Sequence, residues 1–196
     1  MSKHYLTRQI QMGFTLVELL IVVIILAILA AIIVPQFASS TDDAKEAALD
    51  TTLSNVRAAI DLYYQQHGEY PGELTAVPGA ACPGTPAGTP GTGTGGAGAQ
   101  GVQAFIDQLS MYTDANGAAC STTDATFRFG PYVKKNTLSK NPITDVATLA
   151  VVAAGDLNMA GDGANLGWKY DVLTGKFIAN DTTADPNNAG FQYDDR

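Results

Sequence analysis

The chain has 196 residues, which allows one helical anchor and one globular domain of ordinary size but not two large domains. Its net charge is −8, and two of its 11 basic residues, Lys3 and Arg8, precede the first acidic residue. An acidic surface repels nucleic acid phosphates, which argues against general nucleic-acid binding. A local basic patch at Lys134, Lys135 and Lys140 is the remaining alternative, although such a group is more often a solvated loop.

The first predicted element is a membrane-spanning helix that follows a short leader. Residues 1–13 form the leader, which contains basic but no acidic residues, and residues 14–34 are an almost uniformly apolar run. As an α-helix this run is about 32 Å long, close to the roughly 30 Å hydrocarbon core of a bilayer. Because positively charged flanks stay in the cytoplasm, we expect a cytoplasmic N-terminus and a C-terminal domain across the membrane.

Three other interpretations of this run fit it less well. A cleaved secretory signal has a shorter apolar region followed by an A-x-A-like site, which VPQFASS at residues 34–40 matches poorly. A buried core helix does not need so long and uniform an apolar stretch. An ordinary signal anchor fits the length and the orientation but does not explain the acidic residue Glu18.

Glu18 is the only ionisable side chain between Arg8 and Asp42. A charge within a bilayer costs on the order of 3 kcal/mol, so it needs a partner or a route to water. One interpretation is that the side chain reaches the head groups from its place near the start of the run. The functional interpretation is that a neighbouring copy of the same chain supplies a positive charge.

The string GFTLVE at residues 13–18, between a short basic leader and an unbroken apolar helix, resembles the class III signal of type IV pilins and type II secretion pseudopilins. The resemblance implies that a prepilin peptidase cuts after Gly13 and methylates the new amino group of Phe14. It also implies that Glu18 of one subunit pairs with the Phe14 amino group of the adjacent subunit. Such a buried pair sets axial register more than it adds stability, because desolvation offsets much of the Coulomb gain.

An amphipathic continuation of the helix is predicted for residues 35–68. Pro35 removes one backbone donor directly after the apolar run, so we expect a kink before the helix resumes. Apolar residues then recur at spacings of four and three, typical of a helix with one buried face. They are Leu49, Leu53, Val56, Ile60 and Tyr63. His67 and Gly68, with Pro71 beyond them, predict the end of the helix.

Residues 69–196 are predicted to form a globular pilin-like domain, with a loop rich in Gly, Pro and Thr at residues 78–101. This loop has too little apolar surface to form a core. It contains a G-x-G-x-x-G string, but no predicted strand precedes it, so we do not interpret it as a dinucleotide site. Helical spacing of apolar residues over 102–112 predicts a short helix beneath the loop.

Cys82 and Cys120 are the two cysteines of the chain. If the domain is exported, an oxidising compartment favours a disulfide between them, which would restrain a flexible loop. Two unlinked thiols are the alternative. The C-x-x-C spacing of redox and zinc sites is absent from the sequence.

Short β-like runs are predicted beyond the second cysteine. They lie at residues 126–130, 148–154, 167–172 and 175–180. The last two predict a hairpin, because Trp168 and Tyr170 share one side and turn residues precede Phe177. An antiparallel sheet packed on the amphipathic part of the long helix gives an α+β, pilin-like fold.

Side chains with oxygen ligands make calcium a candidate cofactor, and no other cofactor is predicted. Asp156, Asn158 and Asp162 share one predicted loop and suit calcium by type. Major pseudopilins have a calcium site in a C-terminal loop, but these positions do not match it residue by residue. Solvated acidic loops are also commoner than calcium sites.

No catalytic motif is found in the sequence. The two histidines, His4 and His67, are far apart in the chain, and no H-E-x-x-H, G-x-S-x-G or Walker-type string is present. We therefore do not expect an enzyme.

The expected function is a structural subunit of a type IV pilus-like filament, with a pseudopilin of the type II protein secretion system as the first interpretation. A type IV pilin of a surface pilus, for adhesion, twitching motility or DNA uptake, has the same N-terminal features. A monomeric membrane-anchored periplasmic binding module is the alternative from another class, and it leaves Glu18 incidental.

The resemblance also implies the location and the partners. The chain is expected in the inner membrane with its C-terminal domain periplasmic or extracellular, and then in a filament. Expected partners are identical or related pilin-like subunits, the prepilin peptidase, the inner-membrane assembly platform and, before assembly, membrane lipid. No nucleic acid is expected.

Overall fold

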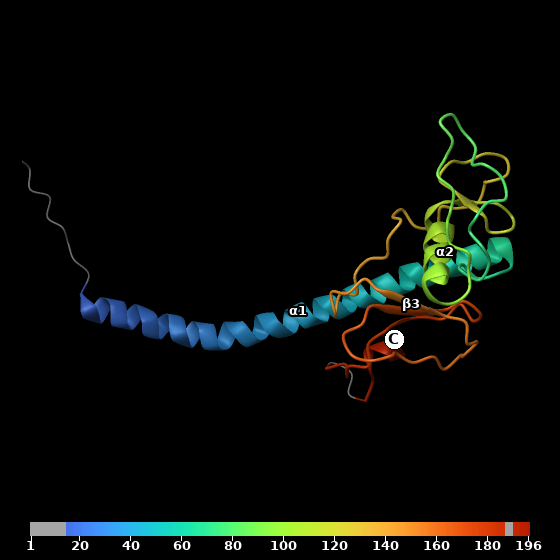
Figure 1. Ribbon diagram of the computed structural model, residues 1–196. Helices are drawn as coiled ribbons and strands as arrows, with labels where there is room; N and C mark the ends of the chain where they lie inside the picture. Colours follow the sequence, from blue (N-terminus) through green and yellow to red (C-terminus); the bar gives the residue numbers. More distant parts are fainter. Residues whose placement is uncertain (1–14, 187–189) are drawn as a thin grey trace, which may run out of the picture. The chain divides into compact units, whose positions relative to one another are not determined.

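The computed structural model describes residues 15–186 and 190–196 (Figure 1). The chain divides into two compact units, Met1–Asp43 and Ala44–Arg196, which we call the N-terminal and the C-terminal unit. Helix α1 (Leu16–His67) contributes to both of them. The second half of this helix therefore belongs to the same unit as the strands, whereas the sequence analysis placed the start of the globular domain at residue 69.

In the N-terminal unit, Leu16–Val34 of α1 form an apolar segment of 19 residues, none of which is buried within the structure. Its length and composition are sufficient to cross a membrane, in agreement with the predicted span. The backbone is helical without interruption through residue 35. The kink at Pro35 stays a prediction.

In the C-terminal unit, α1 buries the predicted apolar stripe. All five stripe residues, from Leu49 to Tyr63, are buried, whereas Asp50 and Asp61 on other faces are exposed. The helix ends at His67, as predicted, because Gly68 adopts φ +76° and donates its N–H to the carbonyl oxygen of Tyr64 at 2.8 Å. A glycine in the left-handed region directly after the last helical residue is a common helix cap.

Helix α2 (Gly98–Ser110) starts and ends earlier than predicted. The sequence analysis placed residues 98–101 in the Gly-rich loop and extended the helix to residue 112, and both bounds are wrong. Glycine has a low helix propensity, but packing overrides it here, because Gly101, Ala104 and Phe105 are all buried. Tyr112 instead begins strand β1.

The Gly-rich segment before α2 is ordered by backbone contacts rather than by an apolar core. The Asp107 carboxylate on α2 accepts hydrogen bonds from the N–H groups of Thr92 at 2.7 Å and Gly93 at 3.2 Å. The Gly93 carbonyl oxygen accepts the N–H of Ala76 at 2.8 Å. A Cβ on Gly93 would collide with the backbone of Ala104, so only glycine allows this approach.

Two small sheets complete the C-terminal unit. Strands β1 (Tyr112–Thr113) and β2 (Ala119–Cys120) pair antiparallel. The second sheet has the order β3-β4-β5 and consists of β3 (Leu149–Val152), β4 (Trp168–Asp171) and β5 (Phe177–Ala179). A 3-10 helix, η1 (Tyr193–Asp195), follows near the end of the chain.

The predicted hairpin is confirmed, but the prediction of a wholly antiparallel sheet is wrong. Strands β4 and β5 pair antiparallel, with Trp168 opposite Ala179. Strands β3 and β4 pair parallel, with Leu149 opposite Trp168, because the connection at residues 153–167 is long enough to return the chain to the same end of the sheet. The fold is therefore α+β with one mixed sheet.

The predicted strand at residues 126–130 is also wrong. Asp124 accepts hydrogen bonds from the N–H groups of Thr126 and Phe127 at 2.7 Å each, which forms a turn instead of an extended chain. One isolated bridge, between Phe129 and Thr113, is the only β-pairing that the structure records for residues 126–130.

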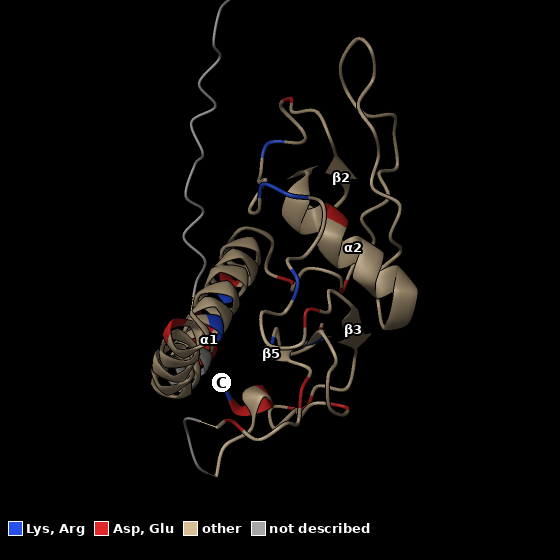
Figure 2. Cartoon of the chain, turned by 90° about the vertical axis from the view of Figure 1, so that its left-hand side faces the viewer, with Lys and Arg blue, Asp and Glu red and all other residues tan. Residues whose placement is uncertain are grey.

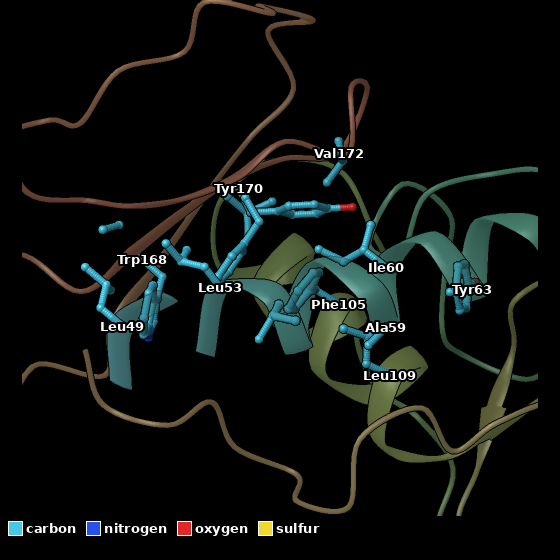
Figure 3. Packing of buried hydrophobic residues seen from close by; sticks show 14 of the residues in the cluster. Leu49, Leu53, Ala59, Ile60, Tyr63, Phe105, Leu109, Trp168, Tyr170 and Val172 are labelled. Atoms are coloured by element: carbon cyan, nitrogen blue, oxygen red, sulfur yellow. The ribbon is translucent and has the colours of Figure 1, made fainter. Parts of the chain in front are cut away.

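The main core lies between α1, α2 and the β3-β4-β5 sheet (Figure 3). Leu53 from α1, Phe105 from α2 and Tyr170 from β4 are buried against one another. Trp168 is fully buried, and its Nε1 donates to the carbonyl oxygen of Ser139 at 2.8 Å. A separate apolar cluster contains a disulfide between Cys82 and Cys120.

His67 attaches the end of α1 to strand β1. Its Nδ1 lies 3.0 Å from the carbonyl oxygen of Tyr63, and its Nε2 lies 3.0 Å from the Thr113 hydroxyl and 3.0 Å from the carbonyl oxygen of Asp114. A neutral ring donates to only one of the two carbonyl oxygens, and with the proton on Nδ1 it donates to Tyr63 while Nε2 accepts from the Thr113 hydroxyl. Burial lowers the pKa of His67 below its usual value of 6.5.

We predict that His67 makes the C-terminal unit less stable in mild acid. Since its pKa is lower in the folded than in the unfolded chain, the unfolded chain binds the proton first, and the free energy of unfolding decreases as the pH falls below about 6.5. Urea unfolding at pH 7 and pH 5 should therefore show a smaller decrease for His67→Gln than for the unmodified chain. His4→Gln is the matched control, and equal decreases in all three proteins would contradict the prediction.

Candidate functional site

The candidate site is the start of α1, where the sequence analysis placed the cleavage, methylation and assembly residues. Gly13 and Phe14 lie outside the described residues. Thr15 is the first described residue, α1 begins at Leu16, and Glu18 is the acidic residue of its first turn.

Thr15 and Glu18 form a capping box around the first turn of α1. The Glu18 N–H donates to the Thr15 hydroxyl at 3.2 Å, and the Thr15 N–H donates to Glu18 Oε2 at 2.9 Å. The Thr15 hydroxyl in turn donates to the same Oε2 at 2.8 Å. Two N–H groups at the helix start are thereby satisfied without solvent. The sequence signal was the T-x-x-E spacing, which the sequence analysis did not use.

The capping box changes how Glu18 is interpreted. All the hydrogen bonds of the box to this carboxylate use Oε2, so Oε1 takes no part in them. Negative charge at a helix N-terminus is also favoured by the helix dipole. The Glu18 carboxylate is therefore held by hydrogen bonds within its own chain before a positively charged group of another chain approaches.

An exposed apolar surface follows the capping box. Large side chains from Leu16 to Val34 are 43 to 82% exposed in the structure. An exposed apolar surface of this length is stable in lipid or against other apolar helices, not in water. The start of α1 thus combines a fixed carboxylate with an apolar surface that needs a partner.

The C-terminal unit contains a charged cluster that was not predicted from the sequence. Arg196 binds Glu46 and Asp50 of α1 at 2.9 Å each and Asp185 at 2.5 Å. Arg57 of α1 donates to the carbonyl oxygen of Arg196 at 2.5 Å. Figure 2 shows the end of the chain beside α1. This cluster attaches residues 185–196 to the helix, and the spacing of Glu46 and Asp50 by four residues was its sequence signal.

The electrostatics of this cluster favour charged Arg196. Burial alone lowers the pKa of its guanidinium, but hydrogen bonds to Asp185 and Asp50 and their negative charges raise it above the usual value. The Asp185 side chain is fully buried, and a positively charged partner offsets part of the cost of burying its carboxylate.

The basic residues considered for nucleic-acid binding have different surroundings. Lys134 and Lys135 border a groove of about 520 Å³ between α1, α2 and residues 132–139, with Phe105 and Leu109 among its apolar lining. Lys140 instead forms an exposed ion pair with Asp145 at 2.8 Å.

The three calcium candidates do not converge on one point. Asp156 accepts the N–H of Asn158 in a local turn at 2.8 Å, whereas Asp162 binds the Lys169 ammonium at 2.5 Å. Within residues 15–186 and 190–196, no group of three or more His, Cys, Asp or Glu side chains is arranged to hold a metal ion. Calcium binding by Asp156, Asn158 and Asp162 stays a prediction.

Comparison with known proteins agrees with this site. Residues 11–34 match the family described as Prokaryotic N-terminal methylation motif. The matched range includes Gly13, Phe14 and the two residues of the capping box. The N-terminal segment is therefore similar to that of type IV pilins and pseudopilins. The α+β layout of the chain is pilin-like as well.

Two curated relatives each match about a third of this pilin-like chain. It is 38% identical over 64 residues to the Type II secretion system core protein G of Pseudomonas aeruginosa, covering 33% of this chain and 45% of that protein. It is 39% identical over 68 residues to a Fimbrial protein of Neisseria meningitidis serogroup B. This match covers 35% of this chain and 40% of the fimbrial protein. The matches thus span less than half of either relative. No solved structure matches the chain significantly.

We predict that the Thr15 hydroxyl stabilises the start of α1. Thr15→Val keeps the shape of the side chain but removes the acceptor of the Glu18 N–H, and loss of such a cap costs about 1 kcal/mol. Hydrogen exchange of the Glu18 amide in detergent micelles should therefore accelerate about fivefold. Thr15→Ser retains the hydroxyl and should exchange at the original rate, so equal rates in both variants would refute the capping role.

Proposed function

We propose that the chain is a structural subunit of a type IV pilus-like filament, specifically a pseudopilin of the type II protein secretion system. The observation that carries the proposal is the fixed Glu18 carboxylate at the start of an exposed apolar helix, within a matched methylation motif. The similarity to a type II secretion core protein supports the choice of system.

In this proposal the N-terminus is processed before assembly. A prepilin peptidase cuts between Gly13 and Phe14 on the cytoplasmic side and methylates the Phe14 amino group. Until assembly residues 14–34 hold the chain in the inner membrane, and the C-terminal unit lies in the periplasm. The inner-membrane assembly platform and other pilin-like subunits are the remaining partners, and no catalytic role is assigned.

Assembly then uses the part of Glu18 that the capping box leaves available. The amino group of Phe14 from an adjacent subunit approaches Oε1 while Oε2 remains bound to Thr15. A carboxylate already fixed in place loses little side-chain entropy on pairing. Because desolvation offsets much of the Coulomb attraction, the pair sets the axial position of neighbouring subunits, and apolar contacts between helices supply most of the stability.

A type IV pilin of a surface pilus is the second candidate. The similarity to a fimbrial protein, at 39% identity over 68 residues, favours it about as strongly. Both candidates use the same N-terminal segment, so they differ in the task of the filament and not in the chemistry of the site.

We predict that Glu18→Ala stops filament formation without stopping processing. Mass spectrometry should find an N-terminus at methylated Phe14 in both the unmodified chain and the variant, because the peptidase acts on each chain separately. The yield of sheared filaments should fall about tenfold or more, the equivalent of at least 1.4 kcal/mol per contact.

Glu69→Ala is the matched control, since Glu69 is an exposed glutamate of the C-terminal unit. It should leave the filament yield unchanged. A mature N-terminus near Ser39 would refute the pilin interpretation. Normal filaments from Glu18→Ala would refute the assembly role of Glu18.

A further inference from the structure

The connection between the parallel strands β3 and β4 has an unusual construction. Parallel strands are commonly joined through a helix, but residues 153–167 form no helix or strand. Met159 and Gly167 are the buried residues of this connection, so apolar burial contributes little to its order. Its backbone groups must therefore find polar partners elsewhere.

Carboxylates accept the N–H groups of this connection. Asp171 of β4 accepts the N–H of Asp156 at 3.0 Å. Asp194 of η1 accepts the N–H of Gly161 at 2.6 Å. Both acceptors are buried, which makes these hydrogen bonds stronger than exposed ones.

Ammonium groups bind the oxygens of the same connection. Lys176 Nζ donates to the carbonyl oxygens of Leu157 at 3.0 Å and Met159 at 3.1 Å. Lys169 Nζ donates to the carbonyl oxygen of Ala160 at 2.9 Å and to Asp162 Oδ1 at 2.5 Å. Four oxygens within six residues are thus bound by two cations.

The hairpin explains how both lysines reach this loop. Lys169 lies between the buried residues Trp168 and Tyr170 of β4, so it projects from the opposite face of the strand. Lys176 directly precedes β5, which pairs with β4. The side chain of Lys169 is only 13% exposed, so it is held in the fold rather than solvated.

These oxygens are of the kind that binds calcium, namely carbonyl and carboxylate oxygens from nearby residues of one loop. We propose that Lys169 and Lys176 replace a metal ion in this connection and that the C-terminal unit therefore folds without calcium. The two ammonium groups supply the same +2 charge as one calcium ion. A calcium ion placed among the same oxygens would be repelled by both of them.

The hydrogen bond and the charge of Lys169 also lower the pKa of Asp162 below its usual value, which keeps this carboxylate ionised. The proposal does not depend on filament assembly, because every contact lies within one C-terminal unit.

One buried carboxylate oxygen, Asp194 Oδ1, has no hydrogen-bond partner in the part of the chain that the structure describes. A metal ion bound there would stabilise the native state. The decisive measurement is therefore the thermal unfolding midpoint of the full chain in detergent, with excess calcium chloride and with excess EDTA. We expect the same midpoint in both.

The lysines are tested directly with Lys169→Met and Lys176→Met, which keep the apolar part of the side chain. Each should lower the midpoint by roughly 5 °C and accelerate hydrogen exchange of the Gly161 and Asp162 amides. Lys140→Met is the matched control, because its ion pair is exposed and it should change neither measurement.

Two outcomes would overturn the proposal. One is a midpoint of the unmodified chain that rises with calcium, and loss of this rise in Asp194→Asn would place the metal ion at that oxygen. The other is hydrogen exchange in Lys169→Met and Lys176→Met no faster than in Lys140→Met. If a lysine variant does not fold, the unfolding midpoints of the unmodified chain in calcium and in EDTA still test whether the C-terminal unit folds without calcium.

Discussion

Burial of one face of α1 is the constraint on which the C-terminal unit depends. Leu49, Leu53 and Ile60 are almost fully buried against α2 and the β3-β4-β5 sheet. Burial of each such side chain contributes about 1.5–3 kcal/mol, so the stripe as a whole outweighs any single polar contact. The sheet has three short strands, and packing against a helix stabilises so small a sheet. One helix therefore serves as the apolar segment of the N-terminal unit and as a wall of the core.

Charged side chains organise the parts of the C-terminal unit that have no regular structure. Asp107 fixes the Gly-rich segment through two backbone N–H groups. Arg196 attaches the last residues to α1, and Lys169 with Lys176 holds the β3–β4 connection. In each case a buried or half-buried charge satisfies backbone or carboxylate groups that apolar packing cannot satisfy. Long irregular segments are therefore compatible with a small core.

Glu18 relates local structure to the proposed assembly. A glutamate in an apolar helix is costly in isolation, and the capping box reduces that cost by giving Oε2 two partners on Thr15. The hydrogen bonds of the capping box use Oε2 and not Oε1. The same carboxylate therefore caps its own helix through Oε2 and has Oε1 for the proposed contact with a neighbouring subunit. Capping and the proposed assembly contact are thus compatible at one residue.

The sequence alone determined the local features of this protein. The apolar run, the position of Glu18, the buried stripe from Leu49 to Tyr63 and the β4–β5 hairpin all follow from patterns within short stretches of chain. Such patterns are readable because helix and strand periodicities fix which residues share a face.

Only the tertiary structure decided the long-range features. The parallel pairing of β3 with β4, the helical start at Gly98 and the partners of Arg196 depend on residues far apart in the chain. The lysines that bind the 153–167 connection belong to the same group, because a sequence shows Asp156 and Asp162 as candidate metal ligands without showing which cation lies nearest. Residue type states what a side chain is able to bind, whereas the fold determines which partner is within hydrogen-bond distance.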